Sequence, residues 1–138
     1  MPRKKAYRLV IDTNLWISML INKDFSFVDK LFDNRQAILI FSEELLEEFL
    51  DVVNRPKFKK YFSDADIDLI LKFIDQNAAF INVSSEFSIC RDEKDNFLLS
   101  LAKDGKADFI LTGDKDLLDL IKLESTEILT IKQFSERG

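Results

Sequence analysis

The segment Tyr7-Arg8-Leu9-Val10-Ile11-Asp12 sets the fold class of this chain. A short run of residues that is apolar on both faces is typical of a strand in a parallel sheet that helices cover on both sides. Asp12 follows this strand directly, so its carboxylate is expected at the carboxyl end of a buried strand. Open α/β sheets bind their ligands beyond that end.

The rest of the chain alternates between short apolar runs and helical patterns. Ser42 is a favourable N-cap for one of the helices, and Pro56 follows the end of that helix. Alternating strands and helices predict an α/β fold, a three-layer α/β/α sandwich with a central, mainly parallel sheet of four to five strands. Further strands are predicted at 37–41, 80–83, 108–111 and 127–131, and helices at 14–21, 25–32, 43–54, 64–76, 94–103 and 116–121.

Composition limits the function classes that are open to the chain. Its 138 residues, 46% of them hydrophobic, predict one domain over residues 1–138. The absence of histidine excludes serine–histidine and cysteine–histidine catalysis. Cys90 is the single cysteine, and neither a signal peptide nor a membrane-spanning run is recognisable, so a cytoplasmic protein without a membrane partner is expected.

The net charge of −5 disfavours a dedicated nucleic-acid-binding module, which usually carries a basic patch. It is compatible with phosphate recognition if several of the acids bind cations, because a bound metal ion reverses the local field. A site without histidine would use oxygen ligands, which select Mg²⁺ or Mn²⁺ over zinc or copper.

Four acidic residues are predicted to meet at the carboxyl edge of the sheet. Asp12 and Asp114 each follow a strand, and Asp95 falls inside the apolar stripe of its helix. Glu48 lies on the rim of the apolar stripe of the helix after Ser42. Two carboxylates about 4 Å apart repel by roughly 4 kcal/mol at an effective dielectric near 20, and a divalent cation relieves this repulsion. Such a cation promotes phosphodiester cleavage by polarising the phosphoryl oxygen and activating a water molecule.

Each of these acids also has a purely structural interpretation. An Asp after a strand can form a turn or cap a helix, and Glu48 can lie on a solvated flank. Asp92 is explained most simply as the N-cap of the helix that contains Asp95, and it is a candidate supporting residue. Because Glu47 adjoins Glu48 and Asp92 precedes Asp95 by three positions, a ligand set shifted to Glu47 or Asp92 stays open.

Four segments carry a family resemblance: VIDTNLWIS (10–18), SEELLEEFLDVVNRPKF (42–58), RDEKDNFLLSLA (91–102) and ADFILTGDKDLL (107–118). Together they resemble the PIN-domain nucleases, and most closely the toxin components of bacterial toxin–antitoxin pairs. The resemblance implies Mg²⁺ or Mn²⁺ dependence, an RNA substrate, a homodimer and inhibition by a cognate antitoxin protein. It implies an acidic tetrad of Asp12, Glu48, Asp95 and Asp114, with Asp116, Asn14, Ser42 and Thr112 in supporting positions and Asp116 as a further candidate metal ligand.

The segment from Arg55 to Tyr61 concentrates basic and aromatic residues. The basic side chains of Arg55, Lys57 and Lys60 are predicted to bind RNA phosphates. The rings of Phe58 and Tyr61, in the same segment, are predicted to stack a base. The structural interpretation is a solvated connection with Phe58 in the core.

The sequence therefore predicts a metal-dependent endoribonuclease that hydrolyses single-stranded RNA. One alternative is a PIN-like protein that binds nucleic acid or a partner without significant catalysis. Another is a metal-dependent phosphatase of the haloacid-dehalogenase type, but that site needs a second Asp where this chain has Asn14. A receiver domain is the third alternative, and the strand at 80–83 lacks the phosphoacceptor Asp that it requires.

Overall fold

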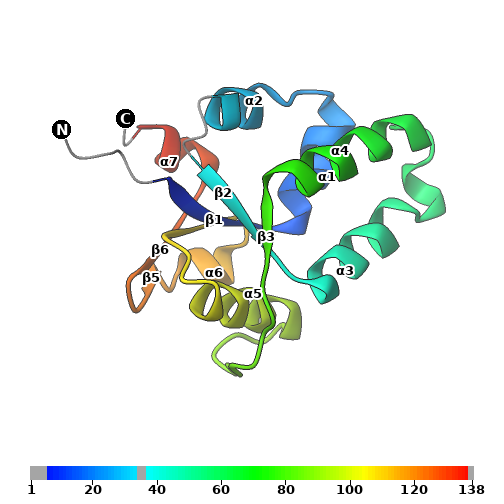
Figure 1. Cartoon of the computed structure of the whole chain (residues 1–138). Coiled ribbons are helices and arrows are strands. Elements are labelled where there is room, and N and C mark those ends of the chain that lie inside the picture. Colours follow the sequence, from blue (N-terminus) through cyan, green and yellow to red (C-terminus); the bar gives the residue numbers. More distant parts are fainter. Residues whose placement is uncertain (1–5, 34–36, 137–138) are drawn as a thin grey trace.

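A sheet with the strand order β3-β2-β1-β4-β6-β5 forms the centre of the protein (Figure 1). The structure is a computed structural model, and it describes residues 6–33 and 37–136. All neighbouring strands are parallel except β5 and β6, which are antiparallel, so the predicted mainly parallel sheet is confirmed. The strands are β1 (Tyr7–Ile11), β2 (Ala37–Phe41), β3 (Ala78–Phe80), β4 (Phe109–Leu111), β5 (Lys122–Leu123) and β6 (Thr126–Leu129).

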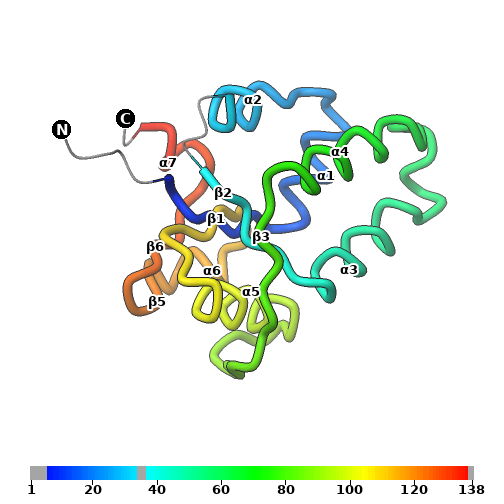
Figure 2. Tube along the Cα trace, in the orientation of Figure 1, coloured from blue at the N-terminus to red at the C-terminus, as the bar shows by residue number. Residues whose placement is uncertain are grey.

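Helices cover both faces of this sheet, which confirms the α/β class with three layers. Figures 1 and 2 show α1, α2 and α4 on one side of the sheet, and α5 and α6 on the other. Helix α3 contacts α1. The helices are α1 (Thr13–Asn22), α2 (Ser26–Asp33), α3 (Glu43–Val53), α4 (Asp64–Asn77), α5 (Glu93–Asp104), α6 (Lys115–Leu118) and α7 (Ile131–Glu136), with a 3-10 turn, η1, at Pro56–Phe58.

The order of the strands reverses direction between β1 and β4. The chain adds β2 and then β3 on one side of β1, crosses the sheet through α5, and continues with β4 on the other side of β1. Ile11 pairs with Leu111, so the residues that follow them, Asp12 and Thr112, leave the sheet at the same level. Ligands of open α/β sheets bind at such a reversal point.

The central strands form the core. Leu9, Val10, Leu39, Ile40 and Ile110 are each 0% exposed, which confirms that the apolar runs are buried on both faces. Residues of α5 pack against this core, and Leu99, Leu101 and Ala102 are also 0% exposed.

The end of α5 comes very close to β2 at Gly105. A Cβ atom at this position would collide with the side chain of Ile40 and lie 3.0 Å from the carbonyl oxygen of Leu101. The missing side chain therefore lets α5 lie directly on the sheet.

The predicted strand at 80–83 is wrong in its position. Helix α4 continues to Asn77, and Ala78 takes extended backbone (φ −102°, ψ 145°), so β3 starts directly after the helix and ends at Phe80. One further backbone hydrogen bond, from Ile81 N to the oxygen of Phe41 (2.8 Å), ends the pairing.

The predicted count of four to five strands and the end of the last strand also need correction. The sheet has six strands because residues 122–123 fold back as the short edge strand β5, which has too few residues to show a periodic pattern. Thr130 and Gln133 exchange hydrogen bonds of 2.9 and 3.0 Å between side chain and backbone, so the chain turns into α7 at Ile131 instead of continuing as a strand. Within the described ranges, no helix combines the length and apolarity needed to cross a membrane.

Candidate active site

Asp12 is fixed by hydrogen bonds at the carboxyl end of β1. Its backbone N–H donates to the oxygen of Leu111 (3.0 Å), which joins it to β4. One carboxylate oxygen accepts from the N–H of Asn14 (3.1 Å) and caps α1, and the other accepts from the hydroxyl of Thr112 (2.7 Å). With 7% of its surface exposed, Asp12 has little freedom to move.

Asp114 is fixed in a similar way two residues after Thr112. The Thr112 hydroxyl oxygen accepts from the backbone N–H of Asp114 (3.0 Å), so this one side chain ties Asp12 to Asp114. The Asp114 carboxylate accepts from the N–H of Asp116 (2.8 Å) and caps the short helix α6. The turn after β4 and the start of α6 therefore bring the carboxylates of Asp114 and Asp116 close together.

Asp95 enters the same place from the first turn of α5. It is 5% exposed, and its Oδ2 atom has no hydrogen-bond partner among the described residues. Burial, followed by the negative charge of Asp114, raises the pKa of Asp95 from 3.8 to about 7. Carboxylate oxygens of Asp95, Asp114 and Asp116 lie within 4.8 Å of one another. These three residues are called the acidic cluster below.

Glu48 lies on α3 and lines the same cleft as Asp95 and Asp114. Ser42 starts this helix by accepting a hydrogen bond from the N–H of Leu45 (3.1 Å), and Glu48 lies on its second turn. Burial raises the pKa of Glu48, and the ammonium group of Lys94, 4.0 Å from Oε1, partly offsets that effect. The neighbouring Glu47 is exposed.

A cleft of about 190 Å³, large enough for several water-sized groups, is lined by Asp12, Glu48, Asp95 and Asp114. Its polar walls come from α1, α3 and α5 and from the turn after β4. The lining residues are Asp12, Thr13, Asn14, Glu48, Val52, Arg55, Lys57, Phe58, Asp92, Lys94, Asp95, Leu98 and Asp114.

A family model described as PIN domain matches residues 8–116, a range that includes the cleft acids. The chain belongs to the PIN domain family. PIN domains are typically metal-dependent nucleases that bind divalent metal ions. The uncharacterized protein MJ1680 of Methanocaldococcus jannaschii is 36% identical over 121 residues, which cover 85% of this chain and 77% of that protein. The comparison with solved structures found no match.

The residues of this PIN domain fit a divalent metal ion. Asp95 is buried, carries an oxygen that has no hydrogen-bond partner within the described part of the chain, and is repelled by its neighbours; a cation would satisfy all three conditions. The donors are carboxylate oxygens, which suit hard cations. The acidic cluster would hold the ion, and Asp12 faces the same cleft.

The structure places most of the predicted site residues around one cleft. Asp12, Asn14, Glu48, Asp92, Asp95 and Asp114 line it, and Asp116 lies in the acidic cluster. Asp92 is also the N-cap of α5, where its carboxylate accepts from the N–H of Lys94 (2.9 Å).

Ser42 and Thr112 are absent from the cleft wall. Ser42 is 1% exposed and acts as the cap of α3, whereas Thr112 is 0% exposed and lies behind Asp12. Among the predicted RNA-binding residues, Arg55 and Lys57 line the cleft. Lys60 does not line it, and its ammonium group lies over the ring of Tyr61, 5.2 Å from the centroid.

Sequence reasoning missed Lys94 and Asn96. Lys94 lines the cleft opposite Glu48, and a single exposed lysine on a helix gives no signal of that partner. Asn96 is 3% exposed and bonds both backbone groups of Cys90, accepting from its N–H (2.8 Å) and donating to its oxygen (2.9 Å). A polar amide inside an apolar helix stripe is the signal that could have identified it. Burial raises the pKa of the Cys90 thiol, so this residue is a poor nucleophile.

Proposed function

We propose that this PIN domain is a magnesium- or manganese-dependent endoribonuclease that hydrolyses phosphodiester bonds of single-stranded RNA. The acidic cluster carries the proposal, because its oxygens lie within 4.8 Å of one another and one buried oxygen of Asp95 has no partner among the described residues. Of the reactions open to a site of carboxylates without histidine, phosphodiester hydrolysis is the one that a hard cation serves best.

The side chains around the cleft would have different roles in this reaction. A bound cation would polarise the phosphoryl oxygen and activate a water molecule. Asp95, Asp114 and Asp116 would hold that ion, while Thr112 keeps Asp12 and Asp114 at a fixed separation through its two hydrogen bonds. Glu48 contributes negative charge from the opposite wall, next to Lys94.

The basic wall of the cleft supports a nucleic-acid substrate. Arg55 and Lys57 extend from the end of α3 and from η1 into the cleft lining, where they can bind phosphates beside the reacting one. Phe58 also lines the cleft, and its ring stacks on Phe62 with the centroids 5.8 Å apart. The stacking on Phe62 holds the Phe58 ring in place, and the ammonium group of Lys57 lies over that ring, 5.1 Å from its centroid.

The partners of this nuclease are part of the proposal. We infer a role as the toxin of a toxin–antitoxin pair, with a cognate antitoxin protein that blocks the cleft and a homodimer as the active form. The family and the resembling segments support this role. Co-expression with the product of a neighbouring reading frame, followed by size-exclusion chromatography, tests both the antitoxin and the dimer.

RNA cleavage by the purified protein tests the activity itself. Labelled single-stranded RNA should be cut with Mg²⁺ or Mn²⁺, spared in excess EDTA and cut again when the metal is restored. Zinc should replace these ions poorly because its preferred nitrogen and sulfur ligands are missing. Undiminished cleavage in EDTA would contradict the proposal, and RNA binding without cleavage would favour a non-catalytic PIN-like protein.

A further inference from the structure

The short segment before α5 has an anchored backbone and an exposed arginine side chain. Asn96 holds the backbone of Cys90 by hydrogen bonds to both its N–H (2.8 Å) and its oxygen (2.9 Å). Asp92, two residues later, is fixed as the N-cap of α5. Between these fixed points, the side chain of Arg91 is 89% exposed. Its backbone is therefore held in place while its guanidinium can move.

The guanidinium of Arg91 lies on a residue of the acidic cluster. Its Nη2 atom is 3.2 Å from both carboxylate oxygens of Asp116, a residue that is 37% exposed. Since Asp116 is also close enough to Asp95 and Asp114 to share a metal ion with them, Arg91 and a metal ion would use the same carboxylate. An exposed ion pair of this kind contributes only about 0–1 kcal/mol, so a divalent cation can displace it.

We propose that Arg91 is a phosphate-binding residue beside the cleft, which rests on Asp116 while the metal site is empty and is released to the substrate when metal binds. The proposal depends on the nuclease function proposed above. Arginine suits this exchange because its planar donors match a carboxylate and a phosphate equally well. The anchor at Cys90 keeps the side chain within reach of the site after its release.

Arg91 would complement Arg55 and Lys57 on the other layer of the protein. Those two residues line the cleft and follow α3, which contacts α1, whereas Arg91 precedes α5, a helix on the other face of the sheet from α1 (Figure 1). An RNA strand that passes over the acidic cluster would meet cations on both sides, so its phosphates would be held before and after the bond that is cut.

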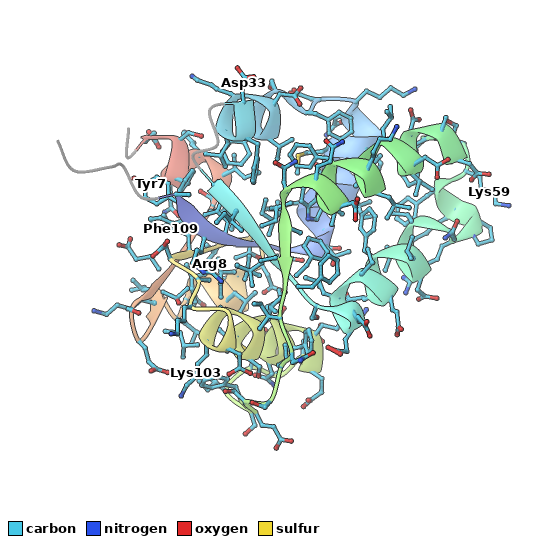
Figure 3. All side chains as sticks on the ribbon, in the orientation of Figure 1. Tyr7, Arg8, Asp33, Lys59, Lys103 and Phe109 are labelled. Atoms are coloured by element: carbon cyan, nitrogen blue, oxygen red, sulfur yellow. The ribbon has the colours of Figure 1, made fainter. Side chains whose placement is uncertain are left out.

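Two measurements on Arg91→Gln test the exchange, with Lys103→Gln as the matched control. Lys103, labelled in Figure 3, forms a comparable exposed pair with Glu124 (3.3 Å) at the far end of α5. Without RNA, Arg91→Gln should bind Mn²⁺ about two- to fivefold more tightly than wild type in an electron paramagnetic resonance titration, because a competing cation is gone.

With Mn²⁺ present, the same variant should bind labelled single-stranded phosphorothioate RNA several-fold more weakly by fluorescence anisotropy. Its plot of log affinity against log salt, which has a negative slope, should become less steep by about 0.7, the value for one phosphate contact on a single strand. Lys103→Gln should leave both measurements unchanged, and Arg91→Lys should keep the salt slope of wild type. A purely structural role for Arg91 would not move metal and RNA affinity in opposite directions.

The outcomes separate this inference from the proposed function. If wild type cuts RNA but Arg91→Gln keeps the Mn²⁺ affinity and the salt slope of wild type, the role of Arg91 is wrong and the nuclease stands. If wild type neither binds nor cuts single-stranded RNA, the proposed function fails and the phosphate role of Arg91 fails with it.

Discussion

Asp12 and Asp114 differ from Glu48 and Asp95 in how the protein holds them. Asp12 and Asp114, the strand-end pair, follow β1 and β4, and their carboxylates accept hydrogen bonds from local backbone groups or from Thr112. Glu48 and Asp95, the helix-borne pair, project from α3 and α5, and burial raises the pKa of both. The strand-end pair thus accepts hydrogen bonds from the protein, whereas in the helix-borne pair Glu48 has only Lys94, 4.0 Å away, and Oδ2 of Asp95 has no partner among the described residues.

This difference assigns two physical roles within one site. The strand-end pair forms a rigid frame that exists without metal, because each carboxylate also caps a helix. The helix-borne pair stores electrostatic repulsion that a cation can relieve. Removing charge from either pair should therefore reduce activity, but it should affect the stability of the metal-free protein differently.

The largest effect is expected for Asp12→Asn. Cleavage should fall by roughly 100-fold or more, since loss of even one preorganised group that stabilises the transition state typically costs that much. Asparagine still caps α1, so the melting temperature of the metal-free protein should hardly change. Asp24→Asn is the control, because Asp24 accepts from the N–H of Ser26 (3.1 Å) next to α2. A destabilised but fully active Asp12→Asn protein would contradict the proposed site.

Glu48→Gln should reduce cleavage by roughly 10- to 100-fold, the range for residues that act on a metal site from just outside its ligands. Glu48 lines the cleft but does not belong to the acidic cluster, which is why a smaller loss is expected. Glu47→Gln provides a control one residue away on the exposed side of α3. If Glu47→Gln loses more activity than Glu48→Gln, the assignment along this helix has to be shifted.

Asp95 should make the metal-free protein less stable as the pH rises. Its folded-state pKa of about 7 lies above the pKa near 3.9 of an unfolded Asp, so the folded protein holds this proton more tightly. The free energy of unfolding should fall between about pH 4 and pH 7, by about 1.4 kcal/mol for each unit by which the folded pKa exceeds the unfolded pKa. Above that range this group should cause no further change.

Asp95→Asn should flatten this pH dependence and raise the melting temperature of the metal-free protein at pH 7. Thermal melts in EDTA over the same pH range measure both effects, and Mn²⁺ should stabilise wild type more than the variant. An equally steep pH profile in Asp95→Asn would show that other groups cause the dependence.

The smallest effect is expected for Thr112→Val, which tests the frame of the strand-end pair. The substitution removes the hydroxyl that donates to Asp12 and accepts from Asp114 N, at a cost of about 1 kcal/mol in stability. Activity should fall by about tenfold because both carboxylates lose their orientation. Thr112→Ser keeps the hydroxyl and should retain most of the activity. Equal losses in both variants would attribute the effect to packing of the methyl group.

The candidate site was predictable to the extent that its residues follow local patterns. Asp12 and Asp114 could be placed because each comes directly after an apolar strand, and parallel strands end at a common edge. The inward direction of Asp95 followed from the helical period of its neighbours. The third strand was misplaced because nothing in the sequence showed that α4 would pass into β3 without a loop.

The sequence by itself determined the α/β class, the family and the carboxyl edge at which the acids gather, because these depend on apolar runs and motifs within short segments. Only the tertiary structure decided that Glu48 meets Lys94, that Asn96 anchors Cys90 and that Arg91 rests on Asp116. It also decided that Asp95 keeps its proton more tightly than a free Asp. These properties depend on burial and on contacts between segments that are distant in the sequence, and both arise only when α3, α5 and α6 pack together in the folded protein.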